Sequence, residues 1–187
     1  MRRRARGLSV LWIGLLAGVL LLQAGPIHGG TTRFSPAREF RAFDLPALAG
    51  GRHALADFRG RPVLLSVWAT WCAPCRQELP QFQRARDELR DEHPDAVFLT
   101  VNLGDGGARV QGFLTRVGLD LPVLLAGQNF VEQYGIRTIP TLFVLDRDGK
   151  LASLHEGWGP DIDLPAALAE DLSSLDRPRS GTDKGSR

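Results

Sequence analysis

The sequence predicts an α/β fold in which helices flank a central mixed β-sheet. Apolar runs of strand length alternate with helically spaced apolar residues through residues 37–175, and this alternation is typical of a sheet covered by helices. A turn signal between the last two runs predicts that the sheet closes with an antiparallel hairpin. The body has about 140 residues, enough for a single domain with its own core.

Seven short runs are predicted as strands because they are rich in apolar and β-branched residues. They cover residues 41–48, 52–58, 62–68, 96–101, 121–125, 141–145 and 151–155. Gly50 and Gly51 separate the first two runs, and their freedom to adopt positive φ favours an N-terminal β-hairpin. The third run, PVLLSVW, is almost continuously apolar, as expected of a central strand buried on both faces.

Four segments carry apolar residues at helical spacing. They cover residues 73–89, 108–117, 129–134 and 164–175. Pro80 lies inside the first segment and is expected to kink that helix. Gly118 follows the second segment and is expected to end it.

The first thirty residues predict export across a membrane. Residues 1–7 carry four arginines, and residues 8–22 form an apolar run whose only polar member is Ser9. This is the pattern of a signal peptide, and counted through Ile27 the stretch reaches the length of about 20 residues that a spanning helix needs. Because no good cleavage site follows, an uncleaved signal anchor is favoured over a cleaved signal peptide. The arginines place the rest of the chain on the far side of the membrane.

We therefore divide the chain into four parts. Residues 1–30 are a signal anchor or signal peptide, 31–36 a linker, 37–175 the folded domain, and 176–187 a disordered tail without large apolar side chains. The formal net charge of +2 reflects the leader, because without its four arginines 19 Lys and Arg face 21 Asp and Glu. The body is slightly acidic, so nucleic acid is not expected as a partner.

The candidate chemistry rests on the only two cysteines, Cys72 and Cys75. They follow the predicted central strand and open the first predicted helix. Unpaired N–H groups and the helix dipole stabilise a thiolate on Cys72 there, and Cys75, one turn on and more buried, can then attack Cys72 to resolve a mixed disulfide. A passive disulfide or half of a metal site are the alternatives. One pair cannot supply the four ligands of a structural zinc site, and no histidine lies at ligand spacing, so no metal is expected.

Two motifs extend this interpretation. Trp71-Cys72-Ala73-Pro74-Cys75 and, further on, Ile139-Pro140-Thr141 resemble the active-site WCxPC and the cis-proline loop of the thioredoxin superfamily, in particular its membrane-tethered, extracytoplasmic TlpA/ResA-like branch. The resemblance covers residues 37–175. It implies a thioredoxin-like fold with the N-terminal β-hairpin and an inserted helix-strand unit at residues 108–125.

The resemblance also implies roles for individual residues. Cys72 and Cys75 are the catalytic cysteines, and Pro74 suits the first helical turn, where an N–H would have no partner. Glu78 returns to the helical face of Cys75 and is expected to adjust proton transfer at the thiols; an ordinary solvated glutamate is the alternative. Ser66 stands where thioredoxins carry a buried aspartate, so this proton transfer falls to Glu78 or to water.

Trp71, Pro74, Thr138, Ile139 and Pro140 are predicted to bind substrate. A cis Pro140 leaves the backbone of Thr138 and Ile139 free to pair with an extended substrate segment, whereas a simple strand-opening proline is the alternative. Trp71 is expected to shield the dithiol and to shape the docking surface, with core packing as its alternative.

These residues predict a thiol-disulfide oxidoreductase that reduces disulfides of exported proteins. By resemblance, the substrates are apocytochrome c or proteins that assemble metal centres, and the electrons come from a membrane thiol donor. The enzyme is expected to be a monomer on the periplasmic side of the inner membrane, anchored there or, if the leader is cleaved, secreted. The expected redox group is the Cys72–Cys75 disulfide, with no cofactor. The alternatives are a disulfide-forming oxidase, a peroxiredoxin-like peroxidase and a Cu(I)-binding thiol carrier.

Overall fold

The computed structural model describes residues 29–177. The predicted leader, except for its last two residues, and the predicted tail from residue 178 onward lie outside this range. Between residues 29 and 177, no helix combines the length and the apolar character needed to cross a membrane.

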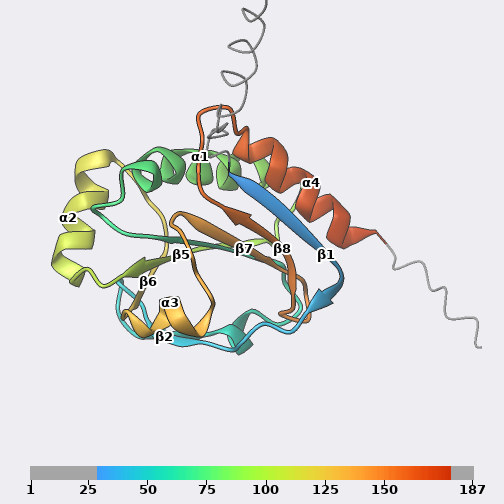
Figure 1. The fold of residues 1–187 in the computed structure, drawn as a ribbon, viewed down its shortest axis with the longest axis horizontal. Helices are drawn as coiled ribbons and strands as arrows, with labels where there is room; N and C mark the ends of the chain where they lie inside the picture. Colours follow the sequence, from blue (N-terminus) through green and yellow to red (C-terminus); the bar gives the residue numbers. More distant parts are fainter. Residues whose placement is uncertain (1–28, 178–187) are drawn as a thin grey trace, which may run out of the picture.

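The centre of the fold is a six-stranded mixed sheet with the strand order β1-β8-β7-β4-β5-β6 (Figure 1). Its strands are β1 (Gly30–Arg38), β4 (Val63–Trp68), β5 (Val97–Leu103), β6 (Val123–Ala126), β7 (Thr141–Leu145) and β8 (Leu151–Glu156). Strands β4, β5 and β6 run parallel, whereas β7 pairs antiparallel with both β4 and β8, and β1 pairs antiparallel with β8. The predicted mixed sheet and its closing hairpin are confirmed.

The predicted N-terminal hairpin is present as a separate two-stranded sheet. It consists of β2 (Asp44–Pro46) and β3 (Arg52–Ala54). Gly50 and Gly51 in its turn both adopt positive φ, which explains why glycine occupies these positions. The second strand of this hairpin, β3, is shorter than the predicted run of residues 52–58, because residues 55–58 form a 3-10 helix, η1 (Leu55–Phe58).

Helices cover both faces of the large sheet. The four α-helices are α1 (Ala73–Leu89), α2 (Gly107–Val117), α3 (Asn129–Gln133) and α4 (Leu164–Asp176). Helices α1 and α4 pack side by side on one face and share an apolar cluster with α2 (Figure 1). The hairpin, η1 and α3 contribute to the cluster on the opposite face. The sheet is therefore buried on both sides, as its apolar strands predicted.

Strand β4 shows how the sequence produces this arrangement. All six of its residues are buried, and successive side chains point to opposite faces. Leu64 and Trp68 belong to the cluster under α1, whereas Leu65 and Val67 belong to the cluster under α3. Ser66 therefore points to the α1 face as well, which places a hydroxyl beneath the first turns of that helix.

One predicted domain boundary is wrong. Residues 31–36 are not a linker but the larger part of β1, which forms an edge of the sheet by pairing with β8. Its side chains are mostly exposed, and it contains Pro36, so it lacks the apolar alternation that reveals a strand. Backbone hydrogen bonds to β8, rather than side-chain burial, hold it in place, which is common for an edge strand.

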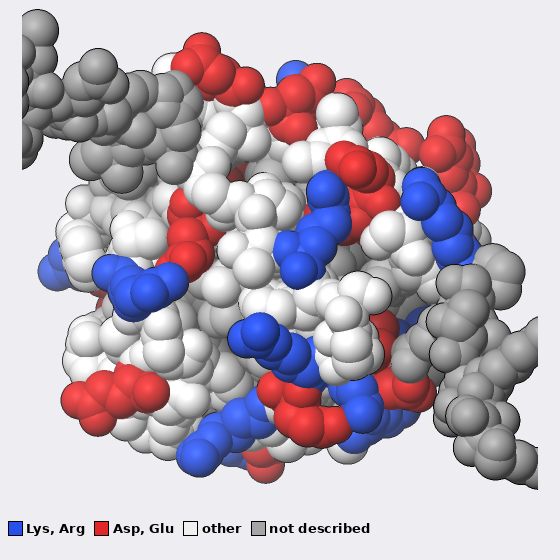
Figure 2. All heavy atoms as spheres, turned by 45° about the vertical axis from the view of Figure 1, so that its right-hand side comes forward, with Lys and Arg blue, Asp and Glu red and all other residues white. Residues whose placement is uncertain are grey.

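Acidic and basic side chains are neighbours on the surface over β1 and α4. Figure 2 shows them intermixed over much of this face. An ion pair fixes the end of α4 to the rest of the domain: the Arg147 guanidinium lies 3.1 Å from the Asp176 carboxylate. Asp176 is thus the last residue of α4, whereas we predicted that the tail begins there.

Candidate active site

The two cysteines lie where the central strand leads into the first long helix. Cys72 is the N-cap of α1, and Pro74 lies in its first turn. The cysteines form a disulfide, and the backbone N–H of Cys75 donates to Cys72 Sγ at 3.1 Å. Cys75 is fully buried and Cys72 is 4% exposed. The predicted order of burial is confirmed, although both sulfurs lie largely out of contact with solvent.

The loop before β7 faces this disulfide. The Ile139–Pro140 peptide bond is cis, and the carbonyl oxygen of Ile139 lies 3.6 Å from Cys72 Sγ. The Thr141 hydroxyl donates to the carbonyl oxygen of Thr138 at 2.6 Å. The fold thus brings the predicted residues of this loop to the cysteines, with the Thr138 carbonyl already accepting one hydrogen bond within the loop.

A groove of about 180 Å³ is lined by two neighbours of Cys72: Trp71, which precedes it in the chain, and Ile139, whose carbonyl oxygen contacts its Sγ. It is lined by Trp71, Leu103, Gln128, Val131, Ile136, Arg137, Thr138 and Ile139. Trp71 is 66% exposed, which contradicts the alternative of core packing and leaves its indole as a wall of the groove. The groove combines an apolar lining with an exposed backbone segment at Thr138, a surface suited to an extended peptide.

Glu78 is buried beneath the disulfide rather than solvated. It follows Cys75 by three residues in α1 and is 3% exposed. The Ser66 hydroxyl donates to this carboxyl group, at 3.2 Å from Oε1 and 3.1 Å from Oε2. Burial raises the pKa of Glu78 to about 8, and the Ser66 hydrogen bond opposes this rise only in part. The alternative of an ordinary surface glutamate is therefore wrong.

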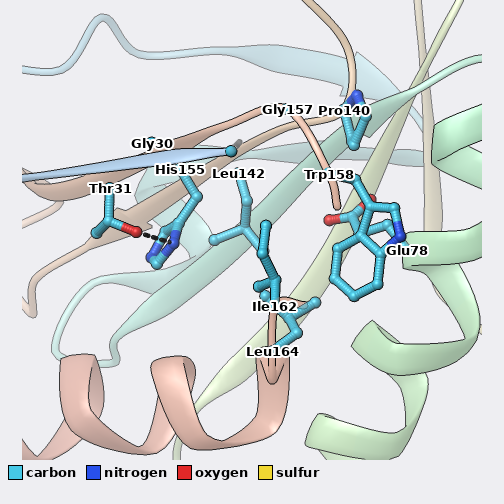
Figure 3. A pocket seen from close by; sticks show the side chains of 11 residues that line it. Gly30, Thr31, Glu78, Pro140, Leu142, His155, Gly157, Trp158, Ile162 and Leu164 are labelled. Carbon is cyan, nitrogen blue, oxygen red and sulfur yellow. Dashed lines mark hydrogen bonds between the residues drawn. The ribbon is translucent and has the colours of Figure 1, made fainter. Parts of the chain in front are cut away.

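A small cavity of about 50 Å³ adjoins Glu78. Glu78, Trp158 and Pro140 lie at one end of it, and Thr31 and His155 lie at the other (Figure 3). The cavity is larger than a single water molecule needs, and its carboxyl, hydroxyl and imidazole groups are suitable hydrogen-bond partners for water. Glu78 is therefore buried from the surface but borders a space that water can occupy.

Comparisons with known proteins agree with this geometry. Residues 36–154 match the model of a family described as the AhpC/TSA family. The chain belongs to this thioredoxin-like family. Thiol-disulfide oxidoreductase ResA of Geobacillus thermodenitrificans (strain NG80-2) is 34% identical over 127 residues, which are 67% of this chain and 72% of the relative.

Two solved structures support the same assignment. The pneumococcal exposed lipoprotein thioredoxin Etrx1 of Streptococcus pneumoniae strain TIGR4 is 33% identical, with a TM-score of 0.58 over 72% of this chain and 100% of that one. StoA of Bacillus subtilis is 27% identical, with a TM-score of 0.59 over 71% of this chain and 96% of that one. The chain is a thiol-disulfide oxidoreductase with a thioredoxin-like fold, as the sequence predicted.

Asp105 supports the active-site loop of the oxidoreductase and was not singled out from sequence. Its carboxylate accepts from the backbone N–H of Thr70 at 2.8 Å, from the Thr70 hydroxyl at 2.9 Å and from the Asn102 amide at 3.1 Å. Burial acts to raise the pKa of Asp105, but these hydrogen bonds outweigh it and hold the pKa below its usual value. The available signal was the position of Asp105 just after β5, because the carboxyl ends of the parallel strands β4 and β5 meet at one edge.

His155 is a buried histidine whose contacts were not expected from the sequence. It is 8% exposed in β8. Its Nε2 lies 2.6 Å from the Asp171 carboxylate of α4, and its Nδ1 lies 2.9 Å from the Thr31 hydroxyl of β1. The Arg33 guanidinium donates to the same carboxylate at 3.1 Å. This cluster joins three elements, and within residues 29–177 no group of three or more His, Cys, Asp or Glu side chains is arranged to hold a metal ion.

Proposed function

We propose that this oxidoreductase reduces disulfides of exported proteins at the extracytoplasmic face of the inner membrane, held there by an uncleaved leader. The observation that carries the proposal is the asymmetry of the cysteine pair. Cys72 is 4% exposed, and its neighbours Trp71 and Ile139 line a groove, whereas Cys75 is fully buried. The location is supported by the basic and apolar leader and by the likeness to a protein described as an exposed lipoprotein.

The substrate class comes from the branch that the sequence resembles. Apocytochrome c or proteins that assemble metal centres are the proposed substrates, and a membrane thiol donor restores the reduced pair. The cysteine pair itself carries both electrons, so the proposed reaction involves no cofactor.

The reaction is a pair of thiol-disulfide exchanges. The Cys72 thiolate attacks one sulfur of the substrate disulfide, and the other substrate sulfur leaves as a thiolate and takes up a proton. The Cys75 thiolate then attacks Cys72 Sγ and releases the second substrate sulfur. Two electrons have passed to the substrate, and the enzyme holds the Cys72–Cys75 disulfide seen in the structure.

Glu78 is proposed to accept the proton that Cys75 must lose before its attack. The two side chains lie on the same helical face, three residues apart, and Ser66 holds the carboxyl group in place. With a pKa of about 8, the carboxyl group is ionised in about a tenth of the molecules at pH 7. The resolving step is therefore expected to accelerate as the pH rises toward 8.

Trp71 and the segment Thr138–Pro140 are proposed to align the substrate. The Ile139 carbonyl oxygen faces Cys72 Sγ at 3.6 Å, so a substrate strand beside this segment brings its cysteine to the sulfur that reacts. Backbone pairing of this kind tolerates many sequences, because it uses main-chain groups for affinity and side-chain pockets only for preference.

The test is reduction of insulin disulfides by the purified chain with dithiothreitol as donor. We expect turnover that Cys72→Ser abolishes. Cys75→Ser is expected to stop turnover as well. When this variant is reduced, freed of dithiothreitol and mixed with insulin, it is expected to accumulate a mixed disulfide between Cys72 and substrate, visible by mass spectrometry. Absence of the mixed disulfide in the Cys75→Ser variant would contradict the assignment of Cys72 as the attacking sulfur.

The same preparation separates the alternatives. Consumption of hydrogen peroxide faster than insulin reduction would replace the proposed function with that of a peroxidase. Stoichiometric Cu(I) binding without insulin reduction would replace it with that of a copper carrier.

A further inference from the structure

The first strand begins at the same end of the sheet as the dithiol. Gly30 pairs with Glu156, Glu156 pairs with Thr141, and Thr141 pairs with Val67. These four residues form one row across β1, β8, β7 and β4. Three strand spacings separate Gly30 from Val67, a distance of about 14 Å. Because β4 leads directly into the loop that carries Cys72, the chain enters the domain at its redox end.

The small cavity next to Glu78 gives an independent measure of this proximity. Gly29 and Gly30 line the same cavity as Glu78 and Pro140. Figure 3 shows Gly30 at the start of β1, on the same side of the cavity as the loop that ends in Pro140. The start of β1 is therefore a neighbour of the active site and not merely on the same side of the molecule.

The chain between the apolar leader and β1 is short. Counted from Leu8 to the length of about 20 residues that a spanning helix needs, the leader ends at Ile27, and only His28 and Gly29 then precede the first residue of β1. Three peptide steps span at most about 10 Å. If the leader remains in the bilayer, the connection between the leader and β1 is too short to let the domain turn its redox end away from the membrane.

The redox face has the side chains of a membrane-contacting surface. Trp71 is one of two exposed large apolar side chains in residues 29–177. Three exposed arginines lie on elements at this end of the domain: Arg76 follows Cys72 by one helical turn, Arg109 lies at the start of α2, and Arg137 lines the groove with Trp71. Tryptophan and arginine are the residues that favour the interface of a bilayer with anionic lipids.

Two of these arginines pair with acids that are less exposed than the arginines themselves. Glu156 pairs with Arg137 at 3.1 Å but is itself only 24% exposed in its side chain, whereas the side chain of Arg137 is 80% exposed. Asp105 lies 3.9 Å from Arg109, and its side chain is 6% exposed against 72% for the arginine. In both pairs the acid lies inside and the guanidinium faces outward.

We propose that the leader and the Arg-rich rim together hold the dithiol face against the headgroups of an anionic bilayer. The inference rests on the proposed function, because it takes the leader to be an uncleaved anchor. It narrows the partners that exchange disulfides with Cys72 to proteins that present their cysteines close to the membrane surface.

The experiment places a small fluorescent label at either end of the domain. The full chain is reconstituted in vesicles of phosphatidylcholine and phosphatidylglycerol that contain a headgroup-nitroxide lipid. One sample carries bimane on Cys72 in the Cys75→Ser variant. The matched control carries bimane on a cysteine introduced by Glu39→Cys, in a chain whose own cysteines are removed by Cys72→Ser and Cys75→Ser. Glu39 is chosen because it is exposed just beyond the far end of β1. The two sites are about 17 Å or more apart along the sheet, so quenching at Cys72 is expected to be about twofold stronger or more.

Three results decide the proposal. Equal or weaker quenching at Cys72, while the wild-type chain in the same vesicles still reduces insulin, overturns the orientation and leaves the proposed function intact. Failure of the chain to float with the vesicles overturns the anchor and this inference together. Arg76→Glu combined with Arg137→Glu is expected to reduce the difference in quenching between the two labelled sites. An unchanged difference contradicts the contact between these arginines and the headgroups.

Discussion

The hydroxyl of Ser66 donates to both carboxyl oxygens of Glu78, at 3.2 Å and 3.1 Å, in the interior of the domain. This contact joins the central strand β4 to helix α1, three residues beyond Cys75. It also gives a buried carboxyl group its only described hydrogen-bond partner within residues 29–177. Burial dominates, so the pKa of Glu78 rises to about 8.

Glu78 is expected to make the folded state less stable as the pH rises. Its pKa is about 8 when folded and about 4.3 when unfolded, so between these values the folded chain binds more protons. The stability contributed by the protonated group is complete below about pH 4 and is lost as the pH approaches 8. Glu78→Gln removes this dependence and is expected to stabilise the chain at pH 8.5 by an amount on the order of a few kcal/mol.

Urea unfolding of the disulfide form at pH 5 and at pH 8.5 checks this expectation. The difference in unfolding free energy between the two pH values should be smaller for Glu78→Gln than for the wild-type chain. Equal differences in both proteins would show that Glu78 titrates at its ordinary pKa.

Ser66→Ala is expected to shift the pH dependence of catalysis upward. The Ser66 hydrogen bond lowers the pKa of Glu78, and a hydrogen bond to a charged group contributes about 1.5 kcal/mol, or roughly one pH unit. The alkaline rise in the insulin-reduction rate should move up by about that amount. Ser153→Ala is the control, since Ser153 is also a buried serine but lies in β8. A shift of the same size in both variants would contradict the role of Ser66.

Asp105→Ala is expected to weaken the loop that carries Cys72. The change leaves the N–H and hydroxyl of Thr70 and the amide of Asn102 without their acceptor. Loss of such a buried network destabilises a protein by about 3 kcal/mol. Asp105→Asn retains one acceptor oxygen and should destabilise less. Thermal unfolding and the insulin-reduction rate measure both effects, and a wild-type rate in Asp105→Ala would show that the loop keeps its position without this carboxylate.

Asp171→Asn is expected to affect stability without affecting redox chemistry. Burial works to raise the pKa of Asp171, but the His155 and Arg33 contacts outweigh it and lower the pKa. The carboxylate therefore contributes stability at neutral pH, and this contribution is lost as the pH falls through the lowered value. Removing one partner of a buried pair destabilises by about 3 kcal/mol. The reduction potential of Cys72–Cys75 should stay within about 10 mV of the wild-type value, and a larger change would assign the cluster to the active site.

The sequence predicted the elements that are buried. Strand β4 and helix α1 carry the periodicities of a central strand and of a one-faced helix, and their order placed Cys72 and Cys75 at the junction. Strand β1 was missed because an edge strand is held by its backbone, which leaves no apolar pattern in the sequence. The short β2–β3 hairpin was predicted because Gly50 and Gly51 are a local signal.

Site contacts between residues of one helix were predicted, whereas contacts between residues of different elements were missed. Cys75 and Glu78 share a helical face through their spacing alone. The contact between Ser66 and Glu78 depends on how α1 packs on β4, which no spacing reveals. The His155–Asp171 pair joins β8 to α4, and the Asp105 contacts join the ends of two adjacent strands, so both required the three-dimensional structure.

The reduction potential of the Cys72–Cys75 pair tests the central claim most directly. The purified chain is equilibrated in glutathione or dithiothreitol redox buffers, and the fraction of disulfide is measured after acid trapping and alkylation. A disulfide reductase is expected to have a potential of about −270 mV, close to that of thioredoxin. A potential of about −120 mV, that of a strong protein oxidant, would contradict the account and make the chain a disulfide-forming enzyme.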